Sequence, residues 1–306
     1  MRVDVSEVKS FKNCQRQWQL SSRNQFHLRP RITPPAFALG TLFHESLHSL
    51  YLGVDLETVM NEVKNEMTDN DTCLLAMIPG YAKNVLEGDL ERFEVLDIEH
   101  KFVIEPVEGL DIQICGSIDM IVVEKDTNKV FGFEHKTAKN FRDTSFLWMD
   151  EQPRIYTVAL IEYIAEKNRK LIEEWNKAGR PVEAEPVLYS LGGVYINEVK
   201  KLLRDFKYQR TLCTYPDDDL SNFFNTFFST CVMIKNSVET DDFKVPSPSY
   251  FACSMCDFRN VCETYMYRSL DKKEILDEFS EELSERETDH LDEKVEREGN
   301  KSEHKD

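Results

Sequence analysis

The chain has 306 residues, enough to bury the core of one large domain or two small ones. Its 56 acidic residues outnumber 38 basic ones, and the net charge of −18 excludes binding of nucleic acid through a broad basic surface. No apolar run approaches the ~20 residues of a membrane span, and the N-terminus lacks the apolar core of a signal peptide. We therefore expect a cytoplasmic protein with no membrane partner.

The N-terminal third is predicted to be helical. Residues 5–20 and 37–52 show apolar side chains at helical spacing, separated by a proline-rich loop, and the second of these helices holds His44 and His48. Residues 55–95 also read as largely helical. The periodicity therefore predicts two helices followed by a helical insert, about 55–96.

Strands and helices mix in the rest of the chain. Strands are predicted at about 97–105, 110–124, 130–136 and 187–196. A helix is predicted at about 146–168, where Pro153 is tolerated only in the first turn. An apolar stripe at helical spacing is interpreted as core: Leu220, Phe223, Phe224, Phe227, Phe228 and Cys231. Three basic clusters are interpreted as solvated faces, although a channel that binds nucleic acid could use them: Arg23, Arg29 and Arg31; Lys136, Lys139 and Arg142; and Lys200, Lys201, Arg204, Lys207 and Arg210.

The segment 269–306 is predicted to be an acidic, disordered or marginally helical tail. Residues 271–306 contain 15 acids and 7 bases, a net charge of −8 that leaves −10 for the rest of the chain. Such a tail solubilises the protein, screens a site that binds nucleic acid, or binds a basic protein partner.

A β-hairpin is the most informative local prediction. A polar turn at Lys125 to Asn128 separates two β-rich runs, and a turn centred there places Asp119 opposite Glu134. Directly opposed residues have β-carbons roughly 4.5–5.5 Å apart, so both carboxylates can hold one cation. Lys136 lies two residues after Glu134 and shares its strand face. A slip of one residue would place the two acids on opposite faces, so the prediction depends on the register.

The cysteines fall into two classes. Cys253, Cys256 and Cys262 form a C-x2-C-x5-C cluster, which needs a fourth ligand for a zinc site or an iron–sulfur cluster, and Cys14 is the candidate. Spacing alone does not separate zinc from iron–sulfur. The other four cysteines have apolar or helical surroundings and are interpreted as small core residues: Cys73, Cys115, Cys213 and Cys231.

The order of motifs resembles a known family. The motifs are Cys14 in a helix, G-x-x-x-H at Gly40 to His44, G-x-x-D at Gly116 to Asp119, E-x-K at Glu134 to Lys136, Q-x3-Y at Gln152 to Tyr156, and the three-cysteine cluster. Together, over about residues 5–268, they resemble the RecB-like branch of the PD-(D/E)XK nuclease superfamily. Within that branch they are most similar to the four-cysteine iron–sulfur exonucleases, the CRISPR-associated adaptation exonucleases and the AddB nuclease domain. Ser117-Ile118 stands where the superfamily's eponymous proline would be.

The resemblance implies an α/β fold with a restriction-endonuclease-like mixed central sheet flanked by helices. It implies one nuclease domain over 1–268, with a segment at about 246–265 joined to the N-terminus by a 4Fe–4S cluster on Cys14, Cys253, Cys256 and Cys262. It also implies DNA exonuclease activity on single-stranded ends, in the 5′ to 3′ direction, in recombination, repair or DNA processing.

The chemistry of the site residues agrees with that resemblance. Asp119, Glu134 and His44 would hold Mg²⁺ or Mn²⁺, the imidazole favouring Mn²⁺, and Lys136 would supply a fixed positive charge. By resemblance, Gln152 and Tyr156 border the active site and contact Lys136 or the DNA strand.

Two other functions compete with this interpretation. His44-Glu45-Ser-Leu-His48 fits the H-E-x-x-H pattern of zinc proteases, with Glu62 or Glu66 as a third ligand. That reading leaves the hairpin acids and the cysteine cluster without a role. A non-catalytic DNA-binding iron–sulfur module is the other alternative, but such a module would not need to keep acids that repel phosphate.

Overall fold

The structure is a computed structural model that describes residues 1–28, 35–106, 109–178, 186–243, 253–254, 256–268, 271 and 273–274, without the side chains of 35–37, 70 and 264–268. Its contacts divide the chain into two compact units. The first contains Met1–Lys9 and Thr33–Glu239, and the second contains Ser10–Ile32 and Thr240–Asp306. The predicted tail lies outside the described residues, apart from 271, 273 and 274, and so does the part of the predicted cysteine segment between 244 and 252.

The first unit follows a mixed α/β order. Its strands are β1 (Arg2–Asp4), β2 (Phe93–Ile104), β3 (Gln113–Glu124), β4 (Lys129–Ala138), β5 (Ser190–Lys200) and β6 (Tyr208–Cys213). Its helices are α3 (Pro35–Tyr51), α4 (Leu56–Glu66), α5 (Leu74–Tyr81), α6 (Glu87–Arg92), α7 (Glu151–Lys177) and α8 (Asp217–Thr240), with 3-10 turns at Asp69–Asp71 and Thr144–Met149 and a π-helical turn at Ala82–Leu86. Helix α1 (Val5–Asn13) begins in this unit.

Within the described residues, six strands form one mixed sheet in the order β1-β3-β4-β5-β6, with β2 on β3. The pairs β2–β3, β3–β4 and β5–β6 are antiparallel, whereas β1–β3 and β4–β5 are parallel. The register of the predicted hairpin is confirmed, because Met120 pairs with Phe133 and Val123 with Val130. A left-handed Asn128 closes its turn. A mixed sheet between helices agrees with the restriction-endonuclease-like architecture that the resemblance implied.

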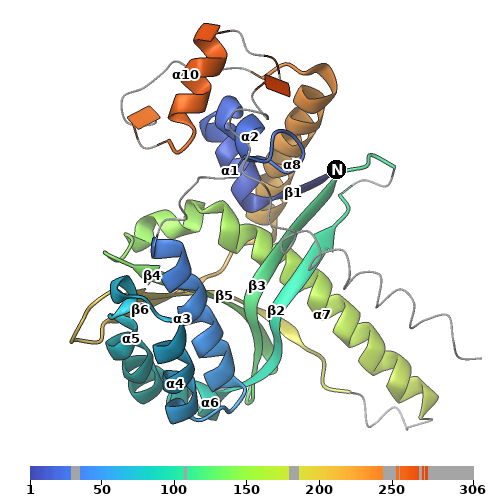
Figure 1. The fold of residues 1–306 in the computed structure, drawn as a ribbon. Coiled ribbons are helices and arrows are strands. Elements are labelled where there is room, and N and C mark those ends of the chain that lie inside the picture. Colours follow the sequence, from blue (N-terminus) through green and yellow to red (C-terminus); the bar gives the residue numbers. More distant parts are fainter. Residues whose placement is uncertain are drawn as a thin grey trace, which may run out of the picture. The chain divides into compact units, whose positions relative to one another are not determined.

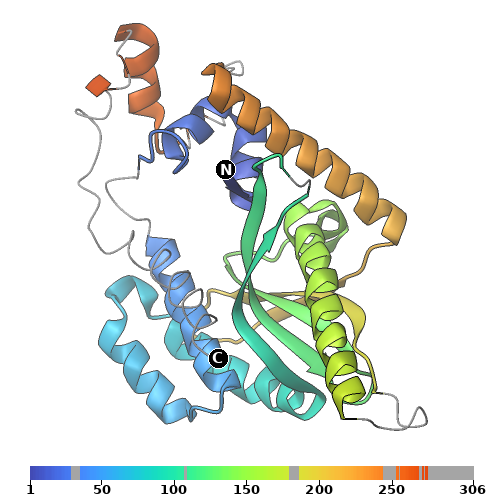
Figure 2. The ribbon, with the colours of Figure 1, turned by 90° about the vertical axis from the view of Figure 1, so that its right-hand side faces the viewer.

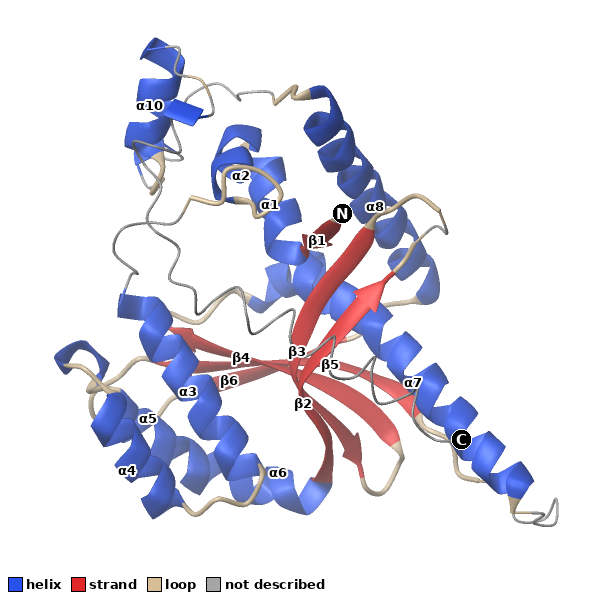
Figure 3. Cartoon of the chain, turned by 45° about the vertical axis from the view of Figure 1, so that its right-hand side comes forward, coloured by secondary structure: helices blue, strands red, loops and turns tan. Residues whose placement is uncertain are grey.

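Helices cover both faces of this sheet (Figures 1–3). On one face, α3 to α6 pack on a core that includes Met120, Val122, Phe131 and Phe133. On the other face, α7 runs across the sheet and packs mainly on β4 and β5. The strand residues around Asp119 are buried on both sides, as their continuous apolar run predicts. In α8, four stripe residues are buried and Phe224 and Phe228 are partly exposed.

Several boundaries differ from the sequence prediction. The helix predicted at 5–20 is divided at Cys14, whose extended backbone ends α1 and whose thiol caps α2 (Gln15–Ser21) by accepting from the Gln17 amide. The helix predicted to begin at 146 begins at Glu151, because Asp150 caps it, and Pro153 lies in the first turn as expected. Strands β1 and β6 were not predicted. Strand β1 has only three residues and β6 lies at the edge of the sheet, so neither shows a clear alternation of apolar and polar residues.

The second unit joins an N-terminal and a C-terminal segment. Leu20, Phe26, Leu28 and Phe258 form its small apolar core, and Cys256 and Cys262 pack against that core. Helix α10 (Arg259–Arg268) carries Cys262. The segments that the sequence analysis expected to be linked through cysteines are therefore parts of the same unit.

Candidate active site

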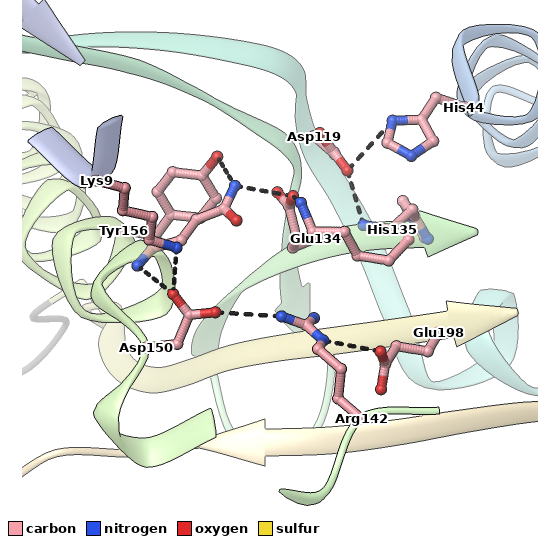
Figure 4. A network of polar contacts seen from close by, with 11 residues as sticks. Lys9, His44, Asp119, Glu134, His135, Arg142, Asp150, Tyr156 and Glu198 are labelled. Atoms are coloured by element: carbon pink, nitrogen blue, oxygen red, sulfur yellow. Dashed lines mark hydrogen bonds and ion pairs between the residues drawn. The ribbon is translucent and has the colours of Figure 1, made fainter. Parts of the chain in front are cut away.

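The two predicted acids lie where strands β3 and β4 separate. The ladder between these strands ends at Met120 and Phe133, one residue before Asp119 and Glu134. Beyond that point, β4 continues its pairing with β5. The backbone amide of His135, which follows Glu134, donates to Asp119 Oδ2 over 2.7 Å. The two strands thus separate at the acids and form a fork there. The Asp119 carboxylate on β3 links the two sides of this fork through its hydrogen bond with β4 (Figure 4).

Glu134 is held by side chains from β4 and α7. Its Oε1 forms an ion pair with Lys136 and accepts a 2.9 Å hydrogen bond from Gln152 Nε2. Gln152 Nε2 also lies 2.9 Å from the hydroxyl of Tyr156, which is one turn further along α7. The other carboxylate oxygen, Glu134 Oε2, is buried and has no hydrogen-bond partner. The structure therefore brings Glu134, Lys136, Gln152 and Tyr156 together as the motif order predicted.

His44 approaches Asp119 from helix α3. Its Nδ1 lies 3.6 Å from Asp119 Oδ2. Burial lowers the pKa of His44, which keeps the imidazole neutral and able to donate its lone pair to a metal. A Cβ at Gly40, one turn earlier on α3, would be in ordinary van der Waals contact with Thr137 Oγ1, at 4.0 Å. Helix α3 thus places His44 beside Asp119, and its role as a metal ligand stays a prediction.

The electrostatics of the acids favour a cation. Burial and the neighbouring Glu134 raise the pKa of Asp119 well above its ordinary value, although the His135 amide and Lys136 act in the opposite direction. Both carboxylates are almost completely buried. Buried acids that repel each other are costly unless a positive charge compensates them, and Lys136 alone is one charge for two acids.

The donors fit Mg²⁺ or Mn²⁺ better than a metal that needs a complete protein cage. Among the described residues, no three His, Cys, Asp or Glu side chains are arranged as a ready metal-binding group. Mg²⁺ is commonly held by one or two carboxylates, with water and substrate phosphate completing its shell. Asp119 and Glu134, with a buried unpartnered oxygen on Glu134, match that pattern.

An ion-pair network anchors the helix that carries Gln152. Asp150, the N-cap of α7, accepts from the Gln152 amide over 3.1 Å and pairs with Lys9 over 2.6 Å. Arg142 links Asp150 to the buried Glu198 of β5, at 3.2 and 2.9 Å (Figure 4). Because these residues come from four separate segments, the network fixes the position of α7 relative to the acids. No motif or periodicity in the sequence indicated this network.

We expect Asp150→Asn to remove a part of the stability that the fold has at neutral pH. Although burial opposes it, hydrogen bonds from Lys9 and the Gln152 amide hold the pKa of Asp150 below its ordinary value. A depressed acid pKa stabilises the fold above that ordinary value, and this stabilisation is lost as the pH falls through the folded-state value. Asn retains the helix cap but not the charge, so about 1–3 kcal/mol should be lost at neutral pH.

Urea unfolding at neutral pH and near pH 3 checks this expectation. The difference between wild type and Asp150→Asn should shrink on acidification. Asp126→Asn, in the exposed hairpin turn, is the matched control and should follow wild type at both pH values. A difference that grows on acidification would contradict the assignment.

A second buried network begins at His135, the residue after Glu134, and the sequence did not predict it. The ring of His135 is fully buried, 6.1 Å from that of His44, and its Nδ1 lies 3.4 Å from Asn197 Nδ2. Arg210 donates to Asn197 and to both carboxylate oxygens of Asp89, each over 2.6 Å. The interpretation of Arg210 as part of a solvated basic face is therefore wrong. The acid that pairs with Arg210 is Asp89, which lies in the predicted helical insert more than a hundred residues earlier, so no local pattern indicated the pair.

Comparison with known proteins agrees with this geometry. A family model described as PD-(D/E)XK nuclease superfamily matches residues 2–263. The chain belongs to the PD-(D/E)XK nuclease superfamily. No curated protein matches the chain. Among solved structures, one described as "Crystal structure of SSO0001" is 14% identical over 85% of each chain, with a TM-score of 0.35, too low to establish a shared fold or function.

Membership of this superfamily implies a nuclease, with DNA as the substrate class and a divalent metal such as Mg²⁺ or Mn²⁺. The H-E-x-x-H alternative finds no support at the nuclease site. The rings of His44 and His48 are 6.4 Å apart, but His44 faces Asp119 whereas His48 Nδ1 lies 3.6 Å from Glu99. In the part of the chain that is described, no helix is long and apolar enough to cross a membrane.

The four candidate cluster cysteines of the nuclease are all in the second unit. Burial, with the nearby thiols of Cys14 and Cys253, raises the pKa of Cys256, and the pKa of Cys262 is raised by burial and the same two thiols. These interactions show that the side chains lie within electrostatic range of one another. They do not form a ready metal-binding group among the described residues. Of the other four cysteines, Cys73, Cys213 and Cys231 are buried and Cys115 is partly exposed.

Proposed function

We propose that this chain is a divalent-metal-dependent DNA exonuclease that acts on single-stranded ends. The observation that carries the proposal is the pair of buried carboxylates, Asp119 and Glu134, at the fork of two strands, with Lys136 as the adjacent cation. A bound Mg²⁺ or Mn²⁺ would supply an activated water and neutralise charge on the scissile phosphate. Activity on single-stranded ends, the 5′ to 3′ direction and a role in recombination, repair or DNA processing rest on the resemblance of the motifs.

Each site residue has a task that follows from its contacts. Asp119, Glu134 and His44 would hold the metal. Lys136, whose ammonium group pairs with Glu134 and is partly exposed, would place a positive charge beside the attacking water or the phosphate. Gln152 donates to Glu134 and so fixes the orientation of its carboxylate, with the free oxygen left for the metal. Tyr156 positions Gln152 from the same helix face.

Cleavage of end-labelled single-stranded DNA tests this function. With Mn²⁺ or Mg²⁺, wild type should shorten linear strands and leave circular single strands intact, and EDTA should stop the reaction. Parallel substrates labelled at the 5′ or the 3′ end give the direction. Cleavage of the circular strand at the same rate would contradict the exonuclease assignment, and intact linear DNA would contradict the nuclease.

We further propose that Cys14, Cys253, Cys256 and Cys262 bind a 4Fe–4S cluster. The support is their spacing, their place in one unit and the electrostatic contact among their thiols. A cluster would tie the start of α2 to the C-terminal segment. Protein purified without oxygen should be brown and contain iron, and Cys256→Ser should lose both, whereas Cys115→Ser should keep them. A colourless wild type with one equivalent of zinc would refute the cluster.

A further inference from the structure

An exposed aromatic turn adjoins the candidate active site. The 3-10 turn Thr144–Met149 lies between β4, which carries Glu134 and Lys136, and α7, which carries Gln152. Phe146 is 64% exposed and Trp148 is 57% exposed. Large apolar side chains that are this exposed and close to a candidate active site indicate a surface that binds a ligand.

The turn is anchored, so these rings are presented by a fixed backbone. Leu147, between the two exposed rings, is buried, and its carbonyl accepts from the Tyr215 hydroxyl over 3.4 Å. Arg154 Nε donates to the Trp148 carbonyl over 2.9 Å, and its guanidinium lies 5.9 Å from the Trp148 ring centroid. Asp143 caps the start of the turn through the Ser145 amide. A backbone held in this way loses little freedom when a ligand binds.

Cationic side chains lie at the same end of the sheet. Strands β4 and β5 are parallel and end together, Ala138 opposite Lys200, and the Lys201 amide donates to the Ala138 carbonyl over 2.8 Å. Lys200 Nζ lies 5.4 Å from the Phe141 ring centroid, at the start of the segment that leads to the turn. Lys139, directly after β4, is exposed. The nearby acids Asp150 and Glu198 are already paired with Lys9 and Arg142.

We propose that Phe146 and Trp148 form a base-stacking platform for unpaired nucleotides of single-stranded DNA beside the carboxylate site. Only unpaired bases offer a free face to an aromatic ring, and aromatic rings combined with cations that contact the backbone are the usual features of single-strand binding. The turn is continuous with β4 and α7, which carry Glu134 and Gln152, so the platform lies near the carboxylate site. The inference rests on the proposed function, whose DNA substrate it specifies.

Binding of a fluorescein-labelled oligothymidylate, with Ca²⁺ in place of the catalytic metal, tests the platform. Trp148→Ala should weaken binding roughly 5- to 150-fold, the range found for loss of one base–aromatic stack, and Phe146→Ala should act in the same direction. Trp148→Phe should restore most of the affinity. Met233→Ala on α8 is the matched control, because Met233 is 54% exposed but lies on another element.

The outcomes separate the platform from the nuclease function. If wild type cleaves single strands and the Phe146→Ala, Trp148→Ala double variant binds them as wild type does, the platform is wrong and the nuclease stands. If Met233→Ala loses as much affinity as Trp148→Ala, the platform is also wrong. If wild type binds the strand through these rings but never cleaves it, the nuclease function fails and the platform stands.

Discussion

Lys136→Ala is expected to lower the rate of DNA cleavage by about 10²- to 10³-fold, the usual loss when one preorganised group that stabilises the transition state is removed. Lys136 pairs with Glu134 and supplies a positive charge beside the two acids. Its side chain is only partly buried, so the fold should survive its removal. Lys136→Arg should not rescue activity fully, because a planar guanidinium does not replace a compact ammonium group.

Initial cleavage rates at saturating Mn²⁺ give the measurement, with thermal unfolding as the check on folding. Lys129→Ala is the matched control. Lys129 lies on the same strand but at its opposite end and is exposed. The Lys129→Ala protein should cleave DNA at the wild-type rate. A Lys136→Ala protein with the wild-type rate and the wild-type melting temperature would show that this lysine has no part in the chemistry.

Asp119→Asn is expected to stabilise the metal-free protein and to remove its stabilisation by metal. At neutral pH the folded chain must keep Asp119 beside Glu134 in a buried site, which raises the pKa of Asp119. Asn removes the charge, and its carbonyl can still accept from the His135 amide. The gain should be about 1–3 kcal/mol, because an incompletely compensated buried charge costs a fold up to several kcal/mol and Asn carries no charge.

The same variant should lose the response to metal. Wild type at a Mn²⁺ concentration a hundred times its dissociation constant should gain about 2.7 kcal/mol, and Asp119→Asn should gain little. Denaturant unfolding in EDTA and in Mn²⁺ shows both effects, and Glu94→Gln, an exposed acid on β2, should behave as wild type in each. An Asp119→Asn protein that is less stable than wild type in EDTA would contradict the cost assigned to the buried acids.

Local chemistry made much of this site predictable. The polar turn at Lys125 to Asn128 set the hairpin register, and the register alone placed Asp119 at the level of Glu134. Helical spacing put Gln152 and Tyr156 on one face of α7, where they reach Glu134. These features depend on residues close in sequence or on a period of two or 3.6 residues, which a single chain displays.

The parts that escaped prediction depend on contacts distant in sequence. Arg142, after β4, reaches Glu198 on β5, and Arg210 on β6 reaches Asp89 on α6. No local pattern specifies either contact. The break at Cys14 arises from a thiol acting as a helix cap, an unusual choice of residue. Phe146, Leu147 and Trp148 are three consecutive apolar residues, and their sequence shows no period that separates buried from exposed side chains. Only the structure shows that Leu147 is buried and that Phe146 and Trp148 are exposed.

We propose that a divalent cation held by Asp119 and Glu134 makes this chain a DNA nuclease. The most direct test is a time course of end-labelled single-stranded DNA with Mn²⁺, run on wild type and Glu134→Gln prepared side by side. Glutamine keeps the size of the side chain and an acceptor for Lys136 and Gln152, but removes the charge that the metal requires. We expect wild type to shorten the strand until EDTA is added and Glu134→Gln to leave it intact. Intact DNA with wild type, or equal rates for the two proteins, would contradict this proposal.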